Sequence, residues 1–455
     1  MAYAAHHALL PSGWQEGVRF ETENGVFSKI EIAAARQGDE QLGVVLPGVP
    51  NLHSHAFQRL FAGLTERRTH SHDTFWTWRE AMFAAALQVT PEAQYTTAKL
   101  LYATMLEQGY TSVGEFHYLH AQPQSDALEM CEALVRAAQE TGIALTLLPV
   151  LYRQGGFNHA PLKEGQHSFA LERDAYANLV LELSRRYAHD TRVRLGLAPH
   201  SLRAVTPEDM KWLLELLHSL PDTTPVHIHV AEQEREVQEC LEHLKARPVE
   251  WLMGNVPLDK RWCLIHATHL LSHEVKGIAK AGATVALCPT TEASLGDGFF
   301  PFTDYLQHEG RFGIGTDSQV CVSPWEELRL VETTARLQHR QRNLSATERV
   351  SSGERLLSKA TATGHVLQHP HGLVVGASAD LVTLNHEHPL LAGLGPATML
   401  DTLIFAHSEG MIQQVMCGGV WRVKTGRHVQ HDDEASRAFA RLRGHLAERL
   451  PSLRV

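Results

Sequence analysis

The chain has 455 residues, of which 44% are hydrophobic, 20% are charged and 7% are aromatic. This composition is ordinary for a globular protein and excludes a disordered or fibrous chain. A chain of this length can bury a large core and accommodates one large domain with a smaller one. The formal net charge is -10. Because phosphate binding needs a concentrated basic face, and the sequence has no cluster of Lys and Arg, we expect no nucleic-acid partner.

The sequence shows no segment typical of a membrane or secreted protein. No stretch reaches the roughly 18 apolar residues of a membrane helix, and residues 1–14 lack the basic and apolar regions of a secretion signal. Six cysteines are widely spaced without a CxxC pair, which favours reduced thiols in the core. We therefore expect a cytoplasmic protein with no membrane partner.

Short strands are predicted at 15–46, where apolar and polar residues alternate around a Glu-Asn-Gly turn. Eight short apolar runs follow, separated by longer helical or loop segments. The runs are VVLPGVPNLHSH, GYTSVGEFHY, GIALTLLPVLY, VRLGLAPHS, TPVHIHVAE, RWCLIHATH, GATVALCPT and RFGIGTD. Buried strands that alternate with helices predict an α/β fold, and eight such units indicate a closed (β/α)8 TIM-type barrel.

Two of the intervening segments, 90–109 and 206–220, begin with a Thr cap and a Pro at the first helical position, which predicts helices. The alternative architecture is an open, doubly wound sheet, which would gather its ligands at one switch point. Nearly every apolar run ends in a polar cluster. This favours the barrel, because a barrel collects all eight strand ends in one mouth.

The last part of the chain returns to β character at 372–430, and a final helix is predicted within 431–455. We expect the strands of 1–46 and 372–430 to form a small β-sandwich from both chain ends. The barrel would then be a separate domain at 47–371.

Histidine is the unusual residue of this chain, with 30 copies, and it is the commonest metal ligand in proteins. His53 and His55 end the first run, and residues two apart on a strand point to the same side. The fifth run supplies His229 and Glu232 at its exit. His227 lies one pleat deeper, so we assign His229 as the ligand and His227 a structural role.

The sixth run ends at His266 and the eighth at Asp317, which can bind a metal and accept a proton. His269 and His273 follow the sixth run and receive no role. Three imidazoles and one carboxylate suit zinc with a position left for water, while iron or another divalent ion stays an alternative.

The order of these motifs, with the segment GASADLV at 376–382, resembles the amidohydrolase superfamily over essentially the whole chain. Within it the chain most closely resembles the formimidoylglutamate deiminases of histidine degradation. That similarity lies in FWTWRE, EFHYLH, HSLRAVTP and TTEASLGDG. Binuclear relatives carry a carboxylated lysine on the third or fourth strand, and these runs contain none, so a single metal ion is expected.

The resemblance implies a zinc-dependent enzyme that hydrolyses N-formimino-L-glutamate to N-formyl-L-glutamate and ammonia, and a homodimer. The implied metal ligands are His53, His55, His229 and Asp317. The implied catalytic residues are Glu232, His266 and Asp317. The implied substrate contacts are Gln58, Arg79, Tyr118, His200 and Arg203.

Several alternatives stay open at this level. Glu232 could merely orient His229, and Arg79 without the resemblance is interpreted as a helix-surface ion pair. Another deaminase of the superfamily, acting on a nucleobase or nucleoside, could stack its base on the aromatic FWTW segment. A relative without catalytic activity could keep the metal for stability. Convergence of Arg79 and Arg203 in one pocket would favour the anionic substrate.

Overall fold

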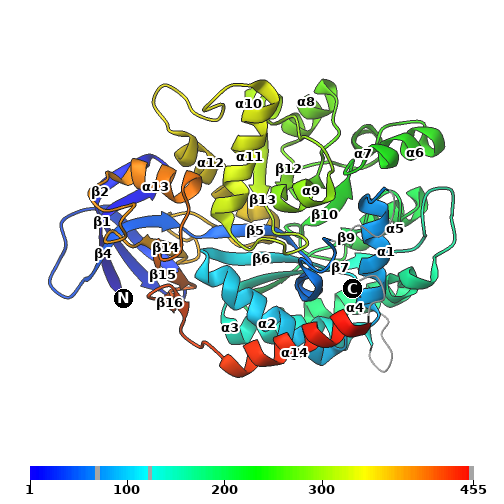
Figure 1. Cartoon of the computed structure of the whole chain (residues 1–455), viewed down its shortest axis with the longest axis horizontal. Helices are drawn as coiled ribbons and strands as arrows, with labels where there is room; N and C mark the ends of the chain where they lie inside the picture. The colour runs from blue at the N-terminus through cyan, green and yellow to red at the C-terminus, as the bar shows by residue number, and fades with distance from the viewer. Residues whose placement is uncertain (67–71, 121–125, 450–455) are drawn as a thin grey trace.

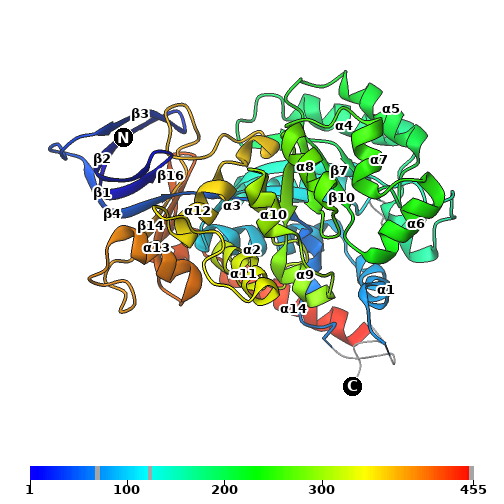
Figure 2. The same ribbon diagram turned by 90° about the horizontal axis from the view of Figure 1, so that it is seen from above.

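The computed structural model describes residues 1–66, 72–120 and 126–449. It contains a parallel barrel and a second sheet built from both ends of the chain, which lie side by side in Figures 1 and 2. The predicted fold class is therefore confirmed. In the part of the chain that the structure describes, no helix has the length and apolarity that crossing a membrane requires.

The barrel strands follow one another as predicted, and neighbours in the sheet run parallel in the order β10-β11-β12-β13-β5-β6-β7-β8. Leu197 pairs with Val226 beyond the end of β8, which closes the ring onto β10. The strands are β5 (Val49–Ser54), β6 (Tyr110–His117), β7 (Ala144–Leu151), β8 (Val193–Leu195), β9 (Ala198–Pro199), β10 (Val226–Val230), β11 (Trp262–His266), β12 (Thr284–Leu287) and β13 (Arg311–Ile314).

Helices alternate with the strands and cover the barrel (Figure 1). The two predicted Thr-Pro starts are confirmed, since Thr90 and Thr206 accept hydrogen bonds from the backbone amides of Ala93 and Asp209. The helices are α1 (Phe75–Ala86), α2 (Pro91–Glu107), α3 (Ala127–Thr141), α4 (Arg173–Arg186), α5 (Pro207–Leu217), α6 (Glu234–Leu244), α7 (Pro248–Asn255), α8 (Ser272–Ala281), α9 (Pro289–Leu295), α10 (Phe302–Gln307), α11 (Pro324–His339) and α12 (Ser352–Thr361). Short 3-10 turns are η1 (Ala56–Phe61), η2 (Glu164–Phe169) and η3 (Gly364–Leu367).

Both ends of the chain share one continuous sheet, in the order β17-β16-β15-β14-β4-β1-β2-β3 (Figure 2). Its strands are β1 (Ala2–Leu10), β2 (Gly13–Glu23), β3 (Val26–Ile32), β4 (Glu40–Pro47), β14 (Leu381–Leu384), β15 (Ile412–Cys417), β16 (Val420–Lys424) and β17 (Arg427–His428). Helix α13 (Pro396–Phe405) lies between β14 and β15, and α14 (Asp433–Arg449) confirms the predicted final helix.

Two details of the terminal sheet differ from the sequence prediction. Strand β1 was not predicted, because Ala and His are weak strand formers; it forms by pairing with β2 on one side and β4 on the other. Residues 44–47 were placed in the first barrel run but belong to β4, which pairs with β14. The break falls at Gly48, between the two sheets.

Gly48 gives a test of how tightly the two sheets are joined. A Cβ atom there would lie 2.6 Å from Cγ2 of Thr111 and closer still to its Oγ1. We expect Gly48→Ala to destabilise the fold by about 1–3 kcal/mol through overpacking, seen as a lower thermal unfolding midpoint. Gly254→Ala is the matched control, because a Cβ on Gly254 in α7 meets nothing within 4 Å. Equal midpoints for the two variants would contradict this view of the joint.

Candidate active site

Three histidine rings meet at the carboxyl end of the barrel. His53 is on β5, His55 follows it, and His229 is on β10. Nε2 of His53 lies 3.1 Å from Nε2 of His55 and 3.1 Å from Nε2 of His229. All three side chains are buried, and their candidate ligand atoms lie within 4.8 Å of one another. The structure thus brings together the three predicted imidazole ligands.

The protonation of these rings suits metal binding. Nδ1–H of His55 donates to the carbonyl of Phe116 at 2.8 Å, and Nδ1–H of His229 donates to the carbonyl of His200 at 3.1 Å. Their Nε2 atoms therefore keep free lone pairs that face one another. Burial lowers the pKa of His55 to about 3 and also lowers the pKa of His53 and His229, so the rings are neutral near pH 7. This group could hold a metal ion.

Asp317, the fourth predicted ligand, lies next to two of these rings. Its Oδ1 lies 3.4 Å from Nε2 of His55 and 3.5 Å from Nε2 of His53. The backbone fixes this geometry, since the amide of Asp317 donates to the carbonyl of His53 and the amide of His55 donates to the carbonyl of Asp317. The Asp317 carboxylate therefore lies beside two of the three imidazoles.

The backbone at the strand ends is unusual. Ala231, His266, Ala267 and Asp317 all have positive φ angles, between 45° and 67°. Non-glycine residues rarely adopt this left-handed conformation, which costs about 1–3 kcal/mol each and is typical of functional sites. These four residues follow or end β10, β11 and β13, so part of the backbone strain of the chain lies around the histidine group.

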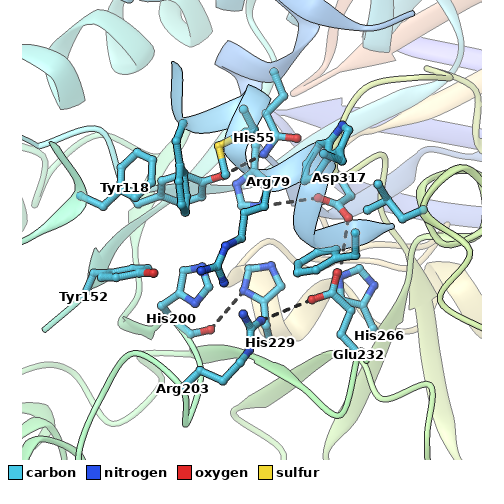
Figure 3. Close-up of a pocket in the computed structure, with 17 residues that line it drawn as sticks. His55, Arg79, Tyr118, Tyr152, His200, Arg203, His229, Glu232, His266 and Asp317 are labelled. Carbon is cyan, nitrogen blue, oxygen red and sulfur yellow. Dashed lines mark hydrogen bonds and ion pairs between the residues drawn. The ribbon is translucent and has the colours of Figure 1, made fainter. Parts of the chain in front are cut away.

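His266 and Glu232 face Asp317 across the cavity (Figure 3). Nε2 of His266 lies 3.6 Å from Oδ2 of Asp317 and 3.8 Å from Oε1 of Glu232. Burial raises the pKa of Glu232 to about 7, against the attraction of His266 and Arg203. Burial alone would lower the pKa of His266, but the carboxylates of Glu232, Glu292 and Asp317 raise it to about 10. Of the two, Glu232 is the group whose pKa suits proton exchange near neutral pH.

Sequence reasoning gave no role to Glu292, which holds His266 in place. Its Oε1 accepts a hydrogen bond from Nδ1–H of His266 at 3.1 Å and from the amide of Cys288 at 2.8 Å. Glu292 lies in the TTEASLGDG segment on α9, and only this family motif pointed to it. The contact directs the other ring nitrogen of His266 toward Asp317.

A cavity opens next to the histidine group. Its wall combines aromatic side chains, among them Phe75, Trp78, Phe83 and Phe169, with polar groups. All five side chains expected to contact the substrate line it, namely Gln58, Arg79, Tyr118, His200 and Arg203. Nε2 of Gln58 donates to the hydroxyl of Tyr118 at 2.8 Å, which fixes both side chains.

Arg79 points from α1 into this cavity (Figure 3), so its interpretation as a surface ion pair is wrong. The guanidinium lies 5.0 Å from the ring centre of Trp76 and 5.1 Å from that of Phe83. Its Nε atom is buried and has no hydrogen-bond partner among the described residues. Burial lowers the pKa of Arg79. A buried guanidinium with an unused donor favours an anionic ligand.

Arg203 enters the same cavity from the segment after β9 (Figure 3). It forms ion pairs with Glu232 and with the fully buried Glu236, each at 3.4 Å. Arg79 and Arg203 both line this cavity, and the charge of Arg203 lowers the pKa of Arg79. The two arginines therefore converge, which is the feature that separates the anionic substrate from a nucleobase.

His227 and Glu232 have surroundings that bear on their predicted roles. Nε2 of His227 donates to the carbonyl of Val366 at 2.8 Å, so this ring is engaged away from the other three. The ring of His229 is oriented by the carbonyl of His200, which leaves no orienting role for Glu232.

Tyr152 lines the cavity as well, although sequence reasoning did not select it.

Comparison with known proteins agrees with this geometry. A model of the amidohydrolase family matches residues 44–422, and a model of the amino-terminal domain of formimidoylglutamate deiminase HutF matches residues 3–44. Formimidoylglutamate deiminase of Pseudomonas aeruginosa is 44% identical over 98% of this chain and 100% of its own length. A 5-methylthioadenosine/S-adenosylhomocysteine deaminase of Nitratidesulfovibrio vulgaris is 26% identical over 89% of this chain and 88% of its own.

A crystal structure of an amidohydrolase from Brucella melitensis superimposes with a TM-score of 0.92 at 44% identity, covering 98% of this chain and 99% of that one. The chain therefore belongs to the amidohydrolase family and is a hydrolase. Within that family it falls with the formimidoylglutamate deiminases, as its motifs indicated.

Proposed function

We propose that this enzyme hydrolyses N-formimino-L-glutamate to N-formyl-L-glutamate and ammonia, as a step of histidine degradation. The observation that carries the proposal is the position of Arg79 and Arg203 in the cavity beside the histidine group. The substrate has two carboxylates, and planar guanidinium groups bind carboxylates through paired hydrogen bonds. A neutral nucleobase would leave the buried charge of Arg79 without a partner. The similarity to the Pseudomonas aeruginosa deiminase supports the same substrate.

We propose one zinc ion per chain, held by His53, His55, His229 and Asp317. Support comes from the facing Nε2 atoms, their lowered pKa values and the nearby carboxylate. Nitrogen and oxygen ligands of this kind suit zinc, and iron or another divalent ion is the alternative. When bound, zinc lowers the pKa of water to about 7 and so makes a strong nucleophile available.

The chain's own residues then manage the protons. Asp317 takes the proton that water loses as its oxygen attacks the formimino carbon, and His266, with Nε2 3.6 Å from Oδ2 of Asp317, orients that water. Glu232 delivers a proton to the terminal nitrogen, so that the carbon–nitrogen bond breaks and ammonia leaves rather than an amide anion. The formyl group stays on the glutamate nitrogen. Arg79, Arg203, Gln58, Tyr118 and His200 hold the substrate.

The direct test is a product assay with N-formimino-L-glutamate, in which ammonia, formylglutamate and formamide are measured together. We expect ammonia and formylglutamate in equal amounts. Formamide with glutamate would mean that the other carbon–nitrogen bond is cut and that the proton scheme is wrong. Turnover of a nucleoside such as 5-methylthioadenosine, with none of the formimino compound, would contradict the proposed substrate.

Removal of the metal is expected to abolish turnover. Prolonged treatment with a chelator should reduce activity to background, and one equivalent of zinc per chain should restore it, because the nucleophile depends on the metal. The measurement is ammonia release together with metal content. Full activity in a protein shown to be free of metal would contradict the zinc site, and restoration only after a second equivalent would contradict a single ion.

We also propose that the enzyme works in the cytoplasm as a homodimer. The six cysteines support a reducing compartment, because all are free. The dimer rests on the family resemblance alone. Sedimentation or light scattering of the purified protein measures its mass, and a single chain mass would contradict the dimer.

A further inference from the structure

Tyr152 follows β7 and its hydroxyl has a defined hydrogen-bond partner. Nε2 of Gln166, on the 3-10 turn η2, donates to this hydroxyl at 2.7 Å. Gln166 is fully buried, and its other contacts are with the backbone. The amide of Lys163 donates to its Oε1 at 2.8 Å, and its Nε2 lies 3.4 Å from the carbonyl of Gly155.

These backbone contacts fix which way the amide of Gln166 faces. The N–H of Lys163 can only donate, and the carbonyl of Gly155 can only accept. If the amide were reversed, its NH2 group would face the N–H of Lys163 and its oxygen would face the carbonyl of Gly155. The NH2 group must therefore face Tyr152. The hydroxyl oxygen of Tyr152 is therefore an acceptor in this contact, and its own proton points elsewhere.

The structure also shows where that proton can go. Tyr152 is 4% exposed and lines the cavity. Its ring is held edge-on against His200, with ring centres 4.8 Å apart, and against Phe169 at 5.9 Å. Its hydroxyl end faces the guanidinium of Arg79 in Figure 3. Arg203 lines the same cavity.

A hydroxyl proton beside two guanidinium groups has no acceptor in either of them, because Arg offers donors only. Among the described residues, the Tyr152 hydroxyl has one hydrogen-bond partner, the amide of Gln166. The group that fills the space must therefore accept hydrogen bonds from Tyr152 and Arg79 at once. A carboxylate does so.

We propose that Tyr152 donates its hydroxyl proton to the substrate carboxylate that Arg79 binds, and that Gln166 is the positioning residue that sets the direction of this proton. The inference rests on the proposed function and adds a third carboxylate donor to the two arginines. Tyr152 is a binding residue for the anionic end of the substrate and takes no part in the proton transfers at the formimino carbon.

The first test is Tyr152→Phe, which keeps the ring and removes the donor. A hydrogen bond to a charged group corresponds to about a 10- to 100-fold change in affinity, so KM should rise by about that factor with kcat nearly unchanged. Tyr176→Phe is the matched control. Tyr176 is also fully buried and donates to the carbonyl of Pro149 at 2.9 Å, but it does not line the cavity. Loss of the Tyr176 hydroxyl should lower the unfolding midpoint and leave KM unchanged.

The second test is Gln166→Glu, which changes no atom that contacts the substrate. The new carboxylate can only accept, so the Tyr152 hydroxyl turns its proton toward it and away from the cavity. We expect a rise in KM similar to that of Tyr152→Phe, and no further rise in the double variant. A purely structural role of Gln166 would instead give additive effects. The unfolding midpoint of each variant shows whether it is folded.

Binding of glutarate, a simple dicarboxylate, gives a readout that needs no turnover. Weaker binding to Tyr152→Phe than to the unchanged enzyme, measured by titration calorimetry, is the expected result. Unchanged KM and unchanged glutarate affinity would overturn the inference. If the unchanged enzyme released no ammonia but its glutarate binding still depended on Tyr152, only the proposed substrate would be wrong. Failure of the unchanged enzyme both to bind glutarate and to release ammonia would overturn both.

Discussion

Glu232→Gln is expected to lower kcat by about 100- to 10,000-fold while KM changes little, because general acid catalysis contributes about that factor. The amide keeps the shape of the side chain but cannot carry the proton to the leaving nitrogen. Glu232 lies 3.8 Å from His266 and lines the cavity, so it can reach the substrate. The measurement is ammonia release at saturating substrate, with metal content determined on the same sample.

Glu236→Gln is the matched control for this prediction. Glu236 is fully buried and pairs with Arg203 at 3.4 Å, as Glu232 does, but it does not line the cavity. Each variant therefore removes one carboxylate partner of Arg203, but only Glu232→Gln also removes the proposed general acid. Equal losses of kcat in the two variants would mean that Glu232 acts through Arg203 and not on the substrate.

Arg79→Ala is expected to reduce kcat/KM for N-formimino-L-glutamate by about 100- to 1,000-fold, which corresponds to about 3–4 kcal/mol. The reason is that the substrate carboxylate would lose its paired hydrogen bonds from the guanidinium of Arg79, whose Nε has no partner among the described residues. Arg79→Lys should recover only part of this loss, because an ammonium group is a point charge without the planar fork. The measurement is a full substrate dependence of ammonia release.

Arg235 supplies the control for Arg79. Its guanidinium lies 4.5 Å from the ring centre of Trp76, the same ring that Arg79 contacts at 5.0 Å, yet Arg235 does not line the cavity. Arg235→Ala should leave KM nearly unchanged. A similar loss in both variants would attribute the effect to Trp76 packing, and no loss in Arg79→Ala would remove the main support for a dianionic substrate.

The barrel could be predicted from the sequence because its signals are local. Runs of apolar residues mark buried strands, and Thr-Pro pairs such as Thr90 with Pro91 start helices through caps that need only neighbouring atoms. The spacing of His53 and His55 fixes both imidazoles on one side of a strand. Closure of an eight-stranded barrel then brings the strand ends together, so that His229 and Asp317 could be assigned from their places in the runs.

Other features depend on contacts between distant segments. Strand β1 has no local strand signal and exists because β2 and β4 pair with it. Arg79 has the sequence context of a surface residue, and only the packing of α1 over the barrel mouth turns it inward. The contact between His266 and Glu292 joins the ends of two successive strand–helix units.

The sequence by itself thus determined the fold class, the order of the candidate metal-binding positions and the family, because these follow from side-chain period, caps and spacing. Only the tertiary structure decided that Arg79 and Arg203 face one cavity. It also decided that Glu292 directs His266 and that Gln166 turns the Tyr152 proton inward. The physical reason is that hydrogen-bond direction and the burial of a charge are set by groups far away in the chain, which the folded barrel alone brings into contact.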